Sequence, residues 1–313
     1  MCLRLLGLAA SVVFALGCGS ATAAQWRSLK PSPLKRTEVA AACVEDRIYV
    51  VGGFVSAGHT TAAVERYDIA RDRWARARSM PVALNHAAIA VYRGDVYDVG
   101  GYEDPNRATG HLLRYDPGSN RWSRLAAMPT KRGALTAGVI GDRLYAAGGA
   151  ADGKALTTLE VYDFKTRRWS PAPPMSVARE HLGGAVSRGS FHVLAGRAAG
   201  VGNMTIAERY LPRQRRWERL PDLHRARGGT TATALADGRI VIAGGEEDAG
   251  TIKEVELYDP SHRAWSALPD MPTSRHGLGV VAQGRRVFTI QGGPQPGFHF
   301  SNAIEALTVP ARG

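Results

Sequence analysis

The sequence has 313 residues, three cysteines and a formal net charge of +12. No Cys/His spacing matches a metal finger or a haem site, so we expect no metal ion and no cofactor. The excess of arginine and lysine favours anionic partners such as acidic sugars, phosphates or a lipid surface. No sequence motif indicates nucleic-acid binding.

Residues 1–24 have the features of an export signal. Arg4 provides a positive charge before an apolar run at residues 5–17, which is too short to span a bilayer. Small residues at 21–24 offer cleavage sites, so we expect residues 25–313 to form a periplasmic or secreted protein. Residues 15–18 also resemble a bacterial lipobox. If Cys18 is acylated, the protein is instead a membrane-anchored lipoprotein.

After residue 25 the sequence repeats about every 48 residues. Each unit has a glycine pair, a tyrosine about 14 residues later, and a tryptophan seven residues after the tyrosine. The glycine pairs are Gly52-Gly53, Gly100-Gly101, Gly148-Gly149, Gly244-Gly245 and Gly292-Gly293, with Gly196-Arg197 in the remaining slot. The aromatic pairs are Tyr67–Trp74, Tyr115–Trp122, Tyr162–Trp169, Tyr210–Trp217 and Tyr258–Trp265. Such a period indicates a solenoid, a propeller or an array.

The second unit shows the elements expected in each repeat. Short runs at residues 87–92, 96–99, 112–115 and 122–125 are mostly apolar, and turn-forming residues separate them. Four such runs predict a four-stranded antiparallel meander, with strands a to d in chain order. Convincing helical periodicity is absent from residues 25–313, so we expect an all-β domain.

The glycine, tyrosine and tryptophan spacing resembles the kelch repeat, a blade of a β-propeller. The resemblance implies that the tyrosines and tryptophans pack between blades. The last unit ends before a tryptophan, whereas Trp26 lies 48 residues before Trp74. We therefore predict a six-bladed propeller whose N-terminal strand completes the last blade and closes the ring, which leaves few exposed edges.

The connections between strands indicate where a ligand would bind. In an up-and-down meander, the long b–c loops and d–a connections share one face, and variable loops on a rigid scaffold commonly carry binding sites. An arginine recurs at one position of the d–a connection in five units: Arg36, Arg132, Arg179, Arg227 and Arg275. A ring of guanidinium groups would bind carboxylates or phosphates. Alternatively, these arginines brace neighbouring blades.

The residues that follow the arginines vary between units, which favours a functional role. The candidates in the d–a connections are Glu38, Asn85, His86, Glu180, His181 and His276. The b–c loops add Phe54, Tyr102, Glu103, Arg197, Glu246, Glu247, Phe298 and His299. Arg197 stands where a glycine is expected, either as a tolerated departure or as a side chain aimed at the channel mouth.

Two functions fit these features. The first is an exported, monomeric binding module whose partner is an envelope protein, an anionic glycan or another small anionic molecule. The second is a mutarotase, because export, six blades and N-terminal closure resemble the periplasmic kelch propeller that interconverts sialic acid anomers. In that case Glu180, His181 and Glu38 would transfer protons, and Arg179 or Arg227 would hold the sugar's carboxylate.

Overall fold

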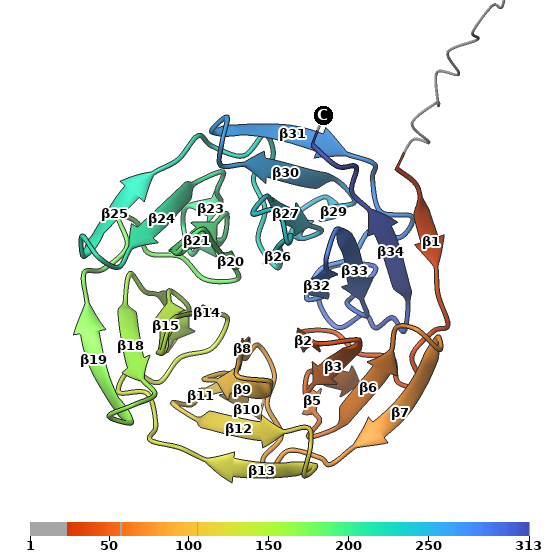
Figure 1. Ribbon diagram of the computed structural model, residues 1–313, viewed down its shortest axis with the longest axis horizontal. Coiled ribbons are helices and arrows are strands. Elements are labelled where there is room, and N and C mark those ends of the chain that lie inside the picture. The colour runs from red at the N-terminus through yellow and green to blue at the C-terminus, as the bar shows by residue number, and fades with distance from the viewer. Residues whose placement is uncertain (1–23, 57, 105, 313) are drawn as a thin grey trace, which may run out of the picture.

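A computed structural model describes residues 24–56, 58–104 and 106–312. These residues form an all-β ring of six four-stranded antiparallel sheets, which confirms the predicted six-bladed propeller (Figure 1). Helices long and apolar enough to cross a membrane are absent from the described ranges. The predicted signal segment and Cys18 lie outside the described residues.

The blades follow one another around the ring in chain order. Blade 1 comprises β2 (Ala40–Val44), β3 (Arg47–Val51), β6 (Val64–Asp68) and β7 (Arg73–Ala77). Blade 2 comprises β8 (Ala88–Tyr92), β9 (Asp95–Val99), β12 (Leu112–Asp116) and β13 (Arg121–Arg124). Blade 3 comprises β14 (Thr136–Ile140), β15 (Arg143–Ala147), β18 (Leu159–Asp163) and β19 (Arg168–Ala172). Blade 4 comprises β20 (Gly183–Ser187), β21 (Ser190–Leu194), β24 (Ala207–Leu211) and β25 (Arg216–Arg219). Blade 5 comprises β26 (Thr231–Ala234), β27 (Ile240–Ala243), β30 (Val255–Asp259) and β31 (Ala264–Leu268).

The sixth blade joins the two ends of the chain. It contains β32 (Gly279–Gln283), β33 (Arg286–Ile290), β34 (Ile304–Thr308) and, at its outer edge, β1 (Trp26–Ser28). Strand β1 pairs antiparallel with β34, with Trp26 opposite Leu307 and Ser28 opposite Glu305. The predicted closure by the N-terminal strand is therefore confirmed.

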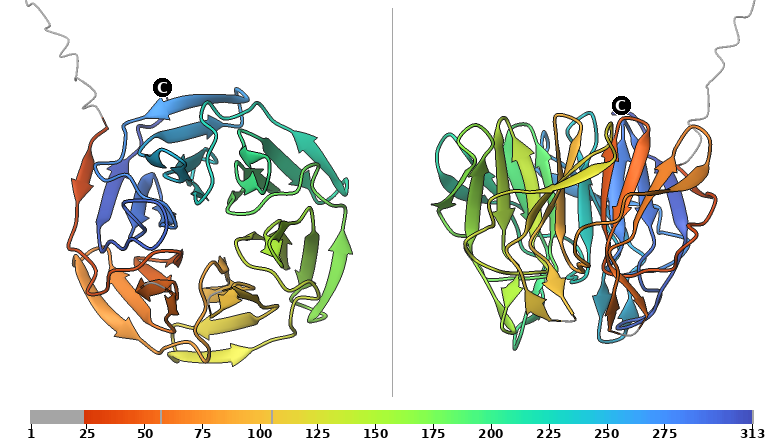
Figure 2. Two further views of the ribbon diagram at one scale, coloured as in Figure 1. Left: turned by 180° about the vertical axis from the view of Figure 1, so that it is seen from behind. Right: turned by 90° about the horizontal axis from the view of Figure 1, so that it is seen from below.

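Short hairpins extend the b–c loops of blades 1 to 5. They pair β4 (Phe54–Ser56) with β5 (His59–Thr60), β10 (Tyr102–Glu103) with β11 (Arg107–Ala108), β16 (Ala150–Ala151) with β17 (Lys154–Ala155), β22 (Arg197–Ala198) with β23 (Gly202–Asn203), and β28 (Glu246–Glu247) with β29 (Gly250–Thr251). The side view shows them gathered at one end of the ring (Figure 2, right). This end, where the d–a connections also lie, is called the mouth.

The repeated aromatic residues connect adjacent blades. The five repeat tyrosines are buried, and each contacts the tryptophan of its own blade, as in the 5.0 Å separation of the Tyr67 and Trp74 rings. The Trp74 indole N–H donates to the Lys30 carbonyl of the neighbouring blade, and Trp26 donates likewise to Pro269. A half-buried indole ring that packs on a buried tyrosine and has a satisfied N–H accounts for the repeat without any ligand.

The glycine pairs occupy a position where adjacent backbones approach closely. Gly52 has a φ of +63°, and a Cβ there would lie 2.3 Å from the carbonyl oxygen of Leu84. The equivalent first positions in blades 4 and 6 hold Ala195 and Gln291, at φ values of 55° and 54°. The pairs predicted at Gly196-Arg197 and Gly292-Gly293 are therefore displaced by one residue.

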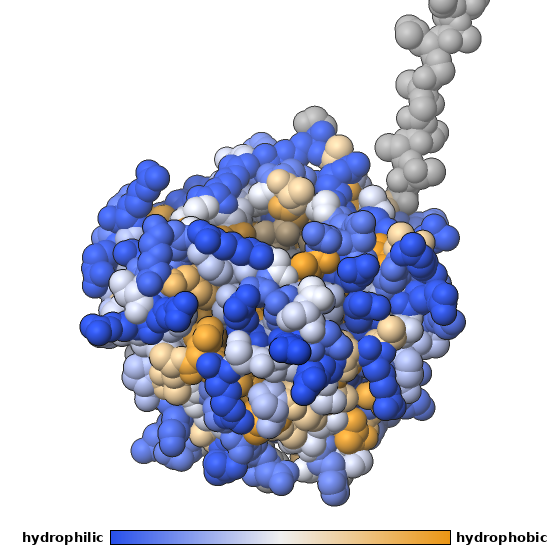
Figure 3. Space-filling model, turned by 60° about the horizontal axis from the view of Figure 1, so that its bottom comes forward, coloured by the Kyte–Doolittle hydropathy of each residue, from blue (hydrophilic) through white to orange (hydrophobic). Residues whose placement is uncertain are grey.

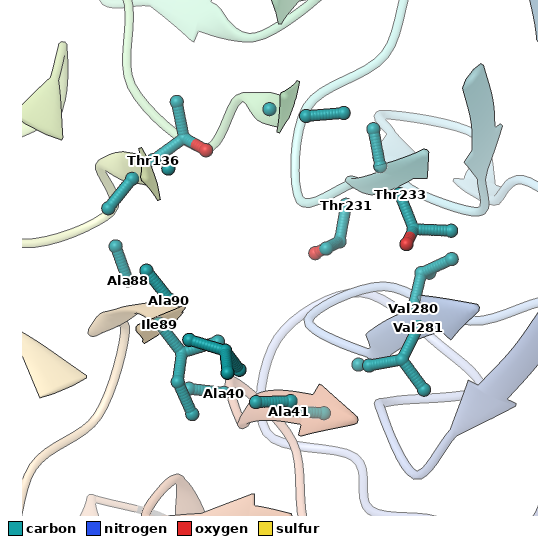
Figure 4. A pocket seen from close by; sticks show the side chains of 18 of the residues that line it. Ala40, Ala41, Ala88, Ile89, Ala90, Thr136, Thr231, Thr233, Val280 and Val281 are labelled. Atoms are coloured by element: carbon teal, nitrogen blue, oxygen red, sulfur yellow. The ribbon is translucent and has the colours of Figure 1, made fainter. Parts of the chain in front are cut away.

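The six innermost strands surround a central channel. Figure 4 shows small apolar and hydroxyl side chains facing it, including Ala41, Ala90, Thr136 and Val281. The cavity among them has a volume of about 330 Å³. On the outside, hydrophilic side chains cover most of the face seen in Figure 3, and hydrophobic ones form only small groups. The channel and its mouth are therefore the main concave features.

Candidate functional site

The repeated arginines do not line the channel. Arg36, Arg132, Arg179, Arg227 and Arg275 are each 0% exposed. Each pairs with a buried glutamate on strand c of its own blade, at 2.5–3.0 Å, through Glu65, Glu160, Glu208, Glu256 and Glu305. Their remaining N–H groups donate mainly to backbone carbonyls, as Arg36 does to Gly52 and Ala63. The expectation of ligand-binding guanidinium groups is thus corrected, and the bracing alternative describes these residues.

Blade 2 replaces the buried ion pair by apolar residues. Leu84 stands at the arginine position and Leu113 at the glutamate position, and both belong to one buried cluster. On the adjacent strand, Asp98 is 1% exposed, and its side-chain oxygen Oδ1 has no hydrogen-bond partner among the described residues. Burial raises the pKa of Asp98 to about 8.

The channel narrows at a ring of six equivalent residues, two positions after the arginine position. This throat ring consists of Glu38, His86, Ala134, His181, Gly229 and Gly277, all with φ between 51° and 63°. Successive blades are joined there by backbone hydrogen bonds, such as His86 N–H to the Glu38 carbonyl and Ala134 N–H to that of His86. Non-glycine residues at such φ values carry strain, which is common at functional sites.

Three throat-ring side chains meet at the channel axis. One carboxylate oxygen of Glu38 and one ring nitrogen each of His86 and His181 all lie within 4.8 Å of one another. His86 Nε2 is 3.2 Å from Glu38 Oε2, and the two imidazole rings are 4.8 Å apart at nearly right angles. This is the one group of three ionisable residues in the described ranges with a geometry suited to a metal ion.

A second layer of charged residues surrounds these three. Arg197 Nε lies 2.9 Å from Glu180 Oε1, and its Nη1 lies 2.7 Å from Glu246 Oε1. His276 Nδ1 lies 3.1 Å from Glu38 Oε1 and 3.4 Å from Glu246 Oε2. Seven residues thus form a closed circuit of contacts, called the mouth circuit: Glu38, His86, His181, Glu180, Arg197, Glu246 and His276.

Mutual contacts shift the pKa values within the mouth circuit. Burial lowers the pKa of His86 to about 4. Burial alone would raise the pKa of Glu38, but the charges of His86 and His276 and a hydrogen bond with His276 bring it well below its usual value. The pKa of His276 is raised, because Glu38 and Glu246 outweigh the effect of burial. Within the circuit, the pKa of His86 and the pKa of His276 are therefore shifted in opposite directions.

Two cavities with shared lining residues open above the mouth circuit. One of about 390 Å³ is bounded by Phe54, Phe298 and Asn106, and one of about 740 Å³ by Tyr102 and Ala199. His86, His181 and Arg197 border both. Burial raises the pKa of Tyr102 to about 12, and its hydroxyl donates to the Ala150 carbonyl. Aromatic walls over a polar floor are typical of sites for small molecules.

Two sets of the sequence-based candidates occupy different places in the structure. Glu38, Asn85, His86, Glu180, His181, Arg197 and His276 lie together at the mouth, whereas the five arginines lie behind it. Arg197 does not replace a glycine. Its backbone forms a β-bridge with Glu180, just as the backbone of Tyr102 does with Asn85, so Arg197 is equivalent to Tyr102. Thr60 and Asn106 are additional site residues: Thr60 accepts a hydrogen bond from Asn85, and Asn106 borders both cavities. No repeat pattern distinguishes these two residues.

Comparisons with known proteins agree with the fold. The Kelch motif matches residues 35–81, 83–129, 131–176 and 227–272. A solved structure, that of YjhT, superposes with a TM-score of 0.73 at 16% identity, covering 88% of this chain and 96% of YjhT. A comparison with curated protein sequences gave no significant match. At that identity the likeness to YjhT concerns the fold alone. The matched repeats extend over more than half of the sequence, and the chain therefore belongs to the family of proteins built from Kelch motifs.

Proposed function

We propose that the protein binds a small, hydroxyl-rich molecule, such as a neutral sugar, at the mouth of the propeller. The observation that carries this proposal is the mouth circuit beneath the two cavities. Its carboxylates and imidazoles offer hydrogen-bond donors and acceptors that suit sugar hydroxyls. Phe54 and Phe298, whose rings are 5.3 Å apart, provide an apolar surface for a sugar ring beside them.

The charge of the mouth circuit favours a neutral ligand over an acidic one. Glu38, Glu180 and Glu246 face the single guanidinium of Arg197, which already contacts two of them. The circuit is net negative while fewer than two of its histidines are protonated. Part of the support for the anionic ligand expected from the sequence came from the five repeated arginines, and their burial removes that part.

A second candidate is mutarotation of a bound sugar. Anomer exchange needs one group that removes a proton and another that supplies one. The imidazoles of His86 and His276 contact different oxygens of the Glu38 carboxylate and could serve these roles. Glu180 and His181 form a further hydrogen-bonded pair at the edge of the larger cavity.

We place this function outside the cytoplasm, because residues 1–24 have the composition of an export signal. Export yields a periplasmic or secreted monomer, and acylation of Cys18 would instead anchor the protein to a membrane. Mass spectrometry of the protein recovered from cell fractions distinguishes a free N-terminus near residue 25 from a lipid-modified Cys18.

The test is proton NMR of the protein mixed with freshly dissolved neutral, acidic and amino sugars. Saturation transfer measures binding, and the decay of the starting anomer measures catalysis. We expect transfer to neutral sugars that is lost in His181→Gly and retained in Ala134→Gly. Faster anomer exchange would establish the mutarotase candidate. Absence of transfer to every sugar would contradict the proposal and point to a protein partner.

A further inference from the structure

We propose that Glu38, His86 and His181 form a binding site for a divalent transition-metal ion, for which Zn²⁺ is the appropriate probe. The sequence indicated no metal site, because these residues lie about 48 and 95 positions apart. The propeller brings them together, since they occupy the same throat-ring position in blades 1, 2 and 4. The site shares the mouth with the proposed sugar site but does not depend on sugar binding.

The hydrogen bonds of Asn85 define the available nitrogen of His86. The Asn85 amide nitrogen donates to Thr60 Oγ1 at 2.8 Å and to the Tyr102 carbonyl at 3.2 Å. A carbonyl only accepts hydrogen bonds, so the Asn85 amide oxygen must face His86 Nδ1, 2.5 Å away. His86 Nδ1 therefore carries the proton, and in the neutral ring Nε2 keeps its lone pair.

That lone pair faces another acceptor. His86 Nε2 lies 3.2 Å from the carboxylate oxygen Oε2 of Glu38. With the proton on Nδ1, a neutral ring would place two lone pairs opposite each other. A cation bound by both atoms would convert this repulsion into attraction, and imidazole and carboxylate are both ligands of Zn²⁺.

The third ligand is oriented in a similar way. His181 Nδ1 lies within hydrogen-bond distance of the Glu180 carboxylate, which only accepts, so the proton is on Nδ1 and Nε2 is free to coordinate. The other carboxylate oxygen of Glu180 is fixed by Arg197 at 2.9 Å. Histidines that bind metals usually donate their second N–H to a carboxylate or carbonyl oxygen, as both histidines do here.

The backbone fixes these side chains in one equivalent conformation. Gly229 and Gly277 adopt the same left-handed conformation in blades 5 and 6 without a side chain. Glu38, His86 and His181 adopt it at φ values of 54°, 51° and 52°, which is costly for residues with a Cβ. Two histidines and one carboxylate leave coordination positions open for water or a ligand oxygen from the cavity.

The test is isothermal titration of the tag-free, metal-stripped protein with Zn²⁺ alone. We expect one high-affinity ion per chain in the wild type. His86→Gly and His181→Gly should each weaken binding by more than about a hundredfold, in line with the loss of a direct ligand. Asn85→Leu, which removes only a positioning contact, should weaken it by roughly ten- to a hundredfold.

Two controls separate the site from other causes. Ala134→Gly makes the same backbone change in blade 3 without removing a ligand, and His262→Ala removes an exposed histidine far from the mouth. Both should bind Zn²⁺ as the wild type does. Circular dichroism establishes that the glycine variants are folded. Equal Zn²⁺ binding by the wild type and folded His86→Gly would overturn the proposal, whereas the sugar experiment would still test the proposed function independently.

Discussion

Two rings of residues lie close together in the sequence but have different roles. The arginine ring (Arg36, Arg132, Arg179, Arg227 and Arg275) repeats one residue type, is fully buried and pairs within each blade. The throat ring, two residues later in each blade, varies from glutamate to histidine to glycine and lies where the channel meets the mouth. The repeated residue stabilises the blade, whereas the varied residue supplies the chemistry.

A large effect on stability is expected from breaking a buried pair in the arginine ring. Arg132→Ala leaves the Glu160 carboxylate buried without its charge partner. We expect a loss of about 3–5 kcal/mol in the free energy of unfolding, because an uncompensated buried charge is costly. Urea denaturation monitored by tryptophan fluorescence measures it.

The apolar blade provides a matched control. In blade 2, Val82, Leu84 and Leu113 stand where blade 3 has Thr130, Arg132 and Glu160. The triple variant Thr130→Val/Arg132→Leu/Glu160→Leu should recover most of the stability lost by Arg132→Ala, because no buried charge remains. A triple variant less stable than Arg132→Ala would show that the ion pair has a role that packing cannot replace.

The next effect concerns Asp98, the buried carboxyl of the blade without an ion pair. Its pKa is about 8 in the folded protein, against an ordinary value of 3.8. As the pH rises, the unfolded chain therefore releases this proton at a lower pH than the folded protein does. Between about pH 4 and pH 8 the free energy of unfolding should fall with rising pH, by at most about 1.4 kcal/mol per pH unit. Above pH 8 both states are ionised and the loss is complete.

Asp98→Val copies Val50, the equivalent residue of blade 1. Urea denaturation from pH 4 to pH 9 should show little difference between variant and wild type at pH 4, and a growing advantage of the variant up to pH 8. A constant difference at all pH values would mean that the Asp98 carboxyl does not titrate as its burial implies.

The smallest effect on stability is expected in the throat ring. His86→Gly places at this position the residue that blades 5 and 6 already have there, and it removes left-handed strain. The free energy of unfolding should change by less than about 1 kcal/mol, since relief of strain offsets lost contacts. Ala134→Gly is the control, and thermal unfolding compares the two. Loss of folding in His86→Gly alone would assign His86 a structural role.

The fold was predictable because its signals repeat. The 48-residue period indicates one blade per repeat. The paired aromatic residues and Trp26 predict contacts between blades that recur around the ring. The mouth residues were predictable as a group because Glu38, His86 and His181 break the repeat. Their contacts with one another were not, since these depend on how six blades converge.

The burial of the arginines also had a signal in the sequence. The unit that lacks the arginine, at Leu84, is the same unit that lacks the strand-c glutamate, at Leu113. Joint replacement of opposite charges by two leucines indicates a buried pair rather than a ligand site. By contrast, the position of Arg197 required the strand register, because the b–c loop of blade 3 is one residue shorter than its equivalents and Ala195 occupies the first glycine position of blade 4.

The most direct test of the difference between the rings uses two residues of blade 4. Arg179→Ala and His181→Gly are compared by urea denaturation and by saturation transfer from the neutral sugars. We predict that Arg179→Ala loses stability while its folded fraction still binds, and that His181→Gly keeps its stability while binding is lost. Binding lost in folded Arg179→Ala but retained in His181→Gly would contradict the account.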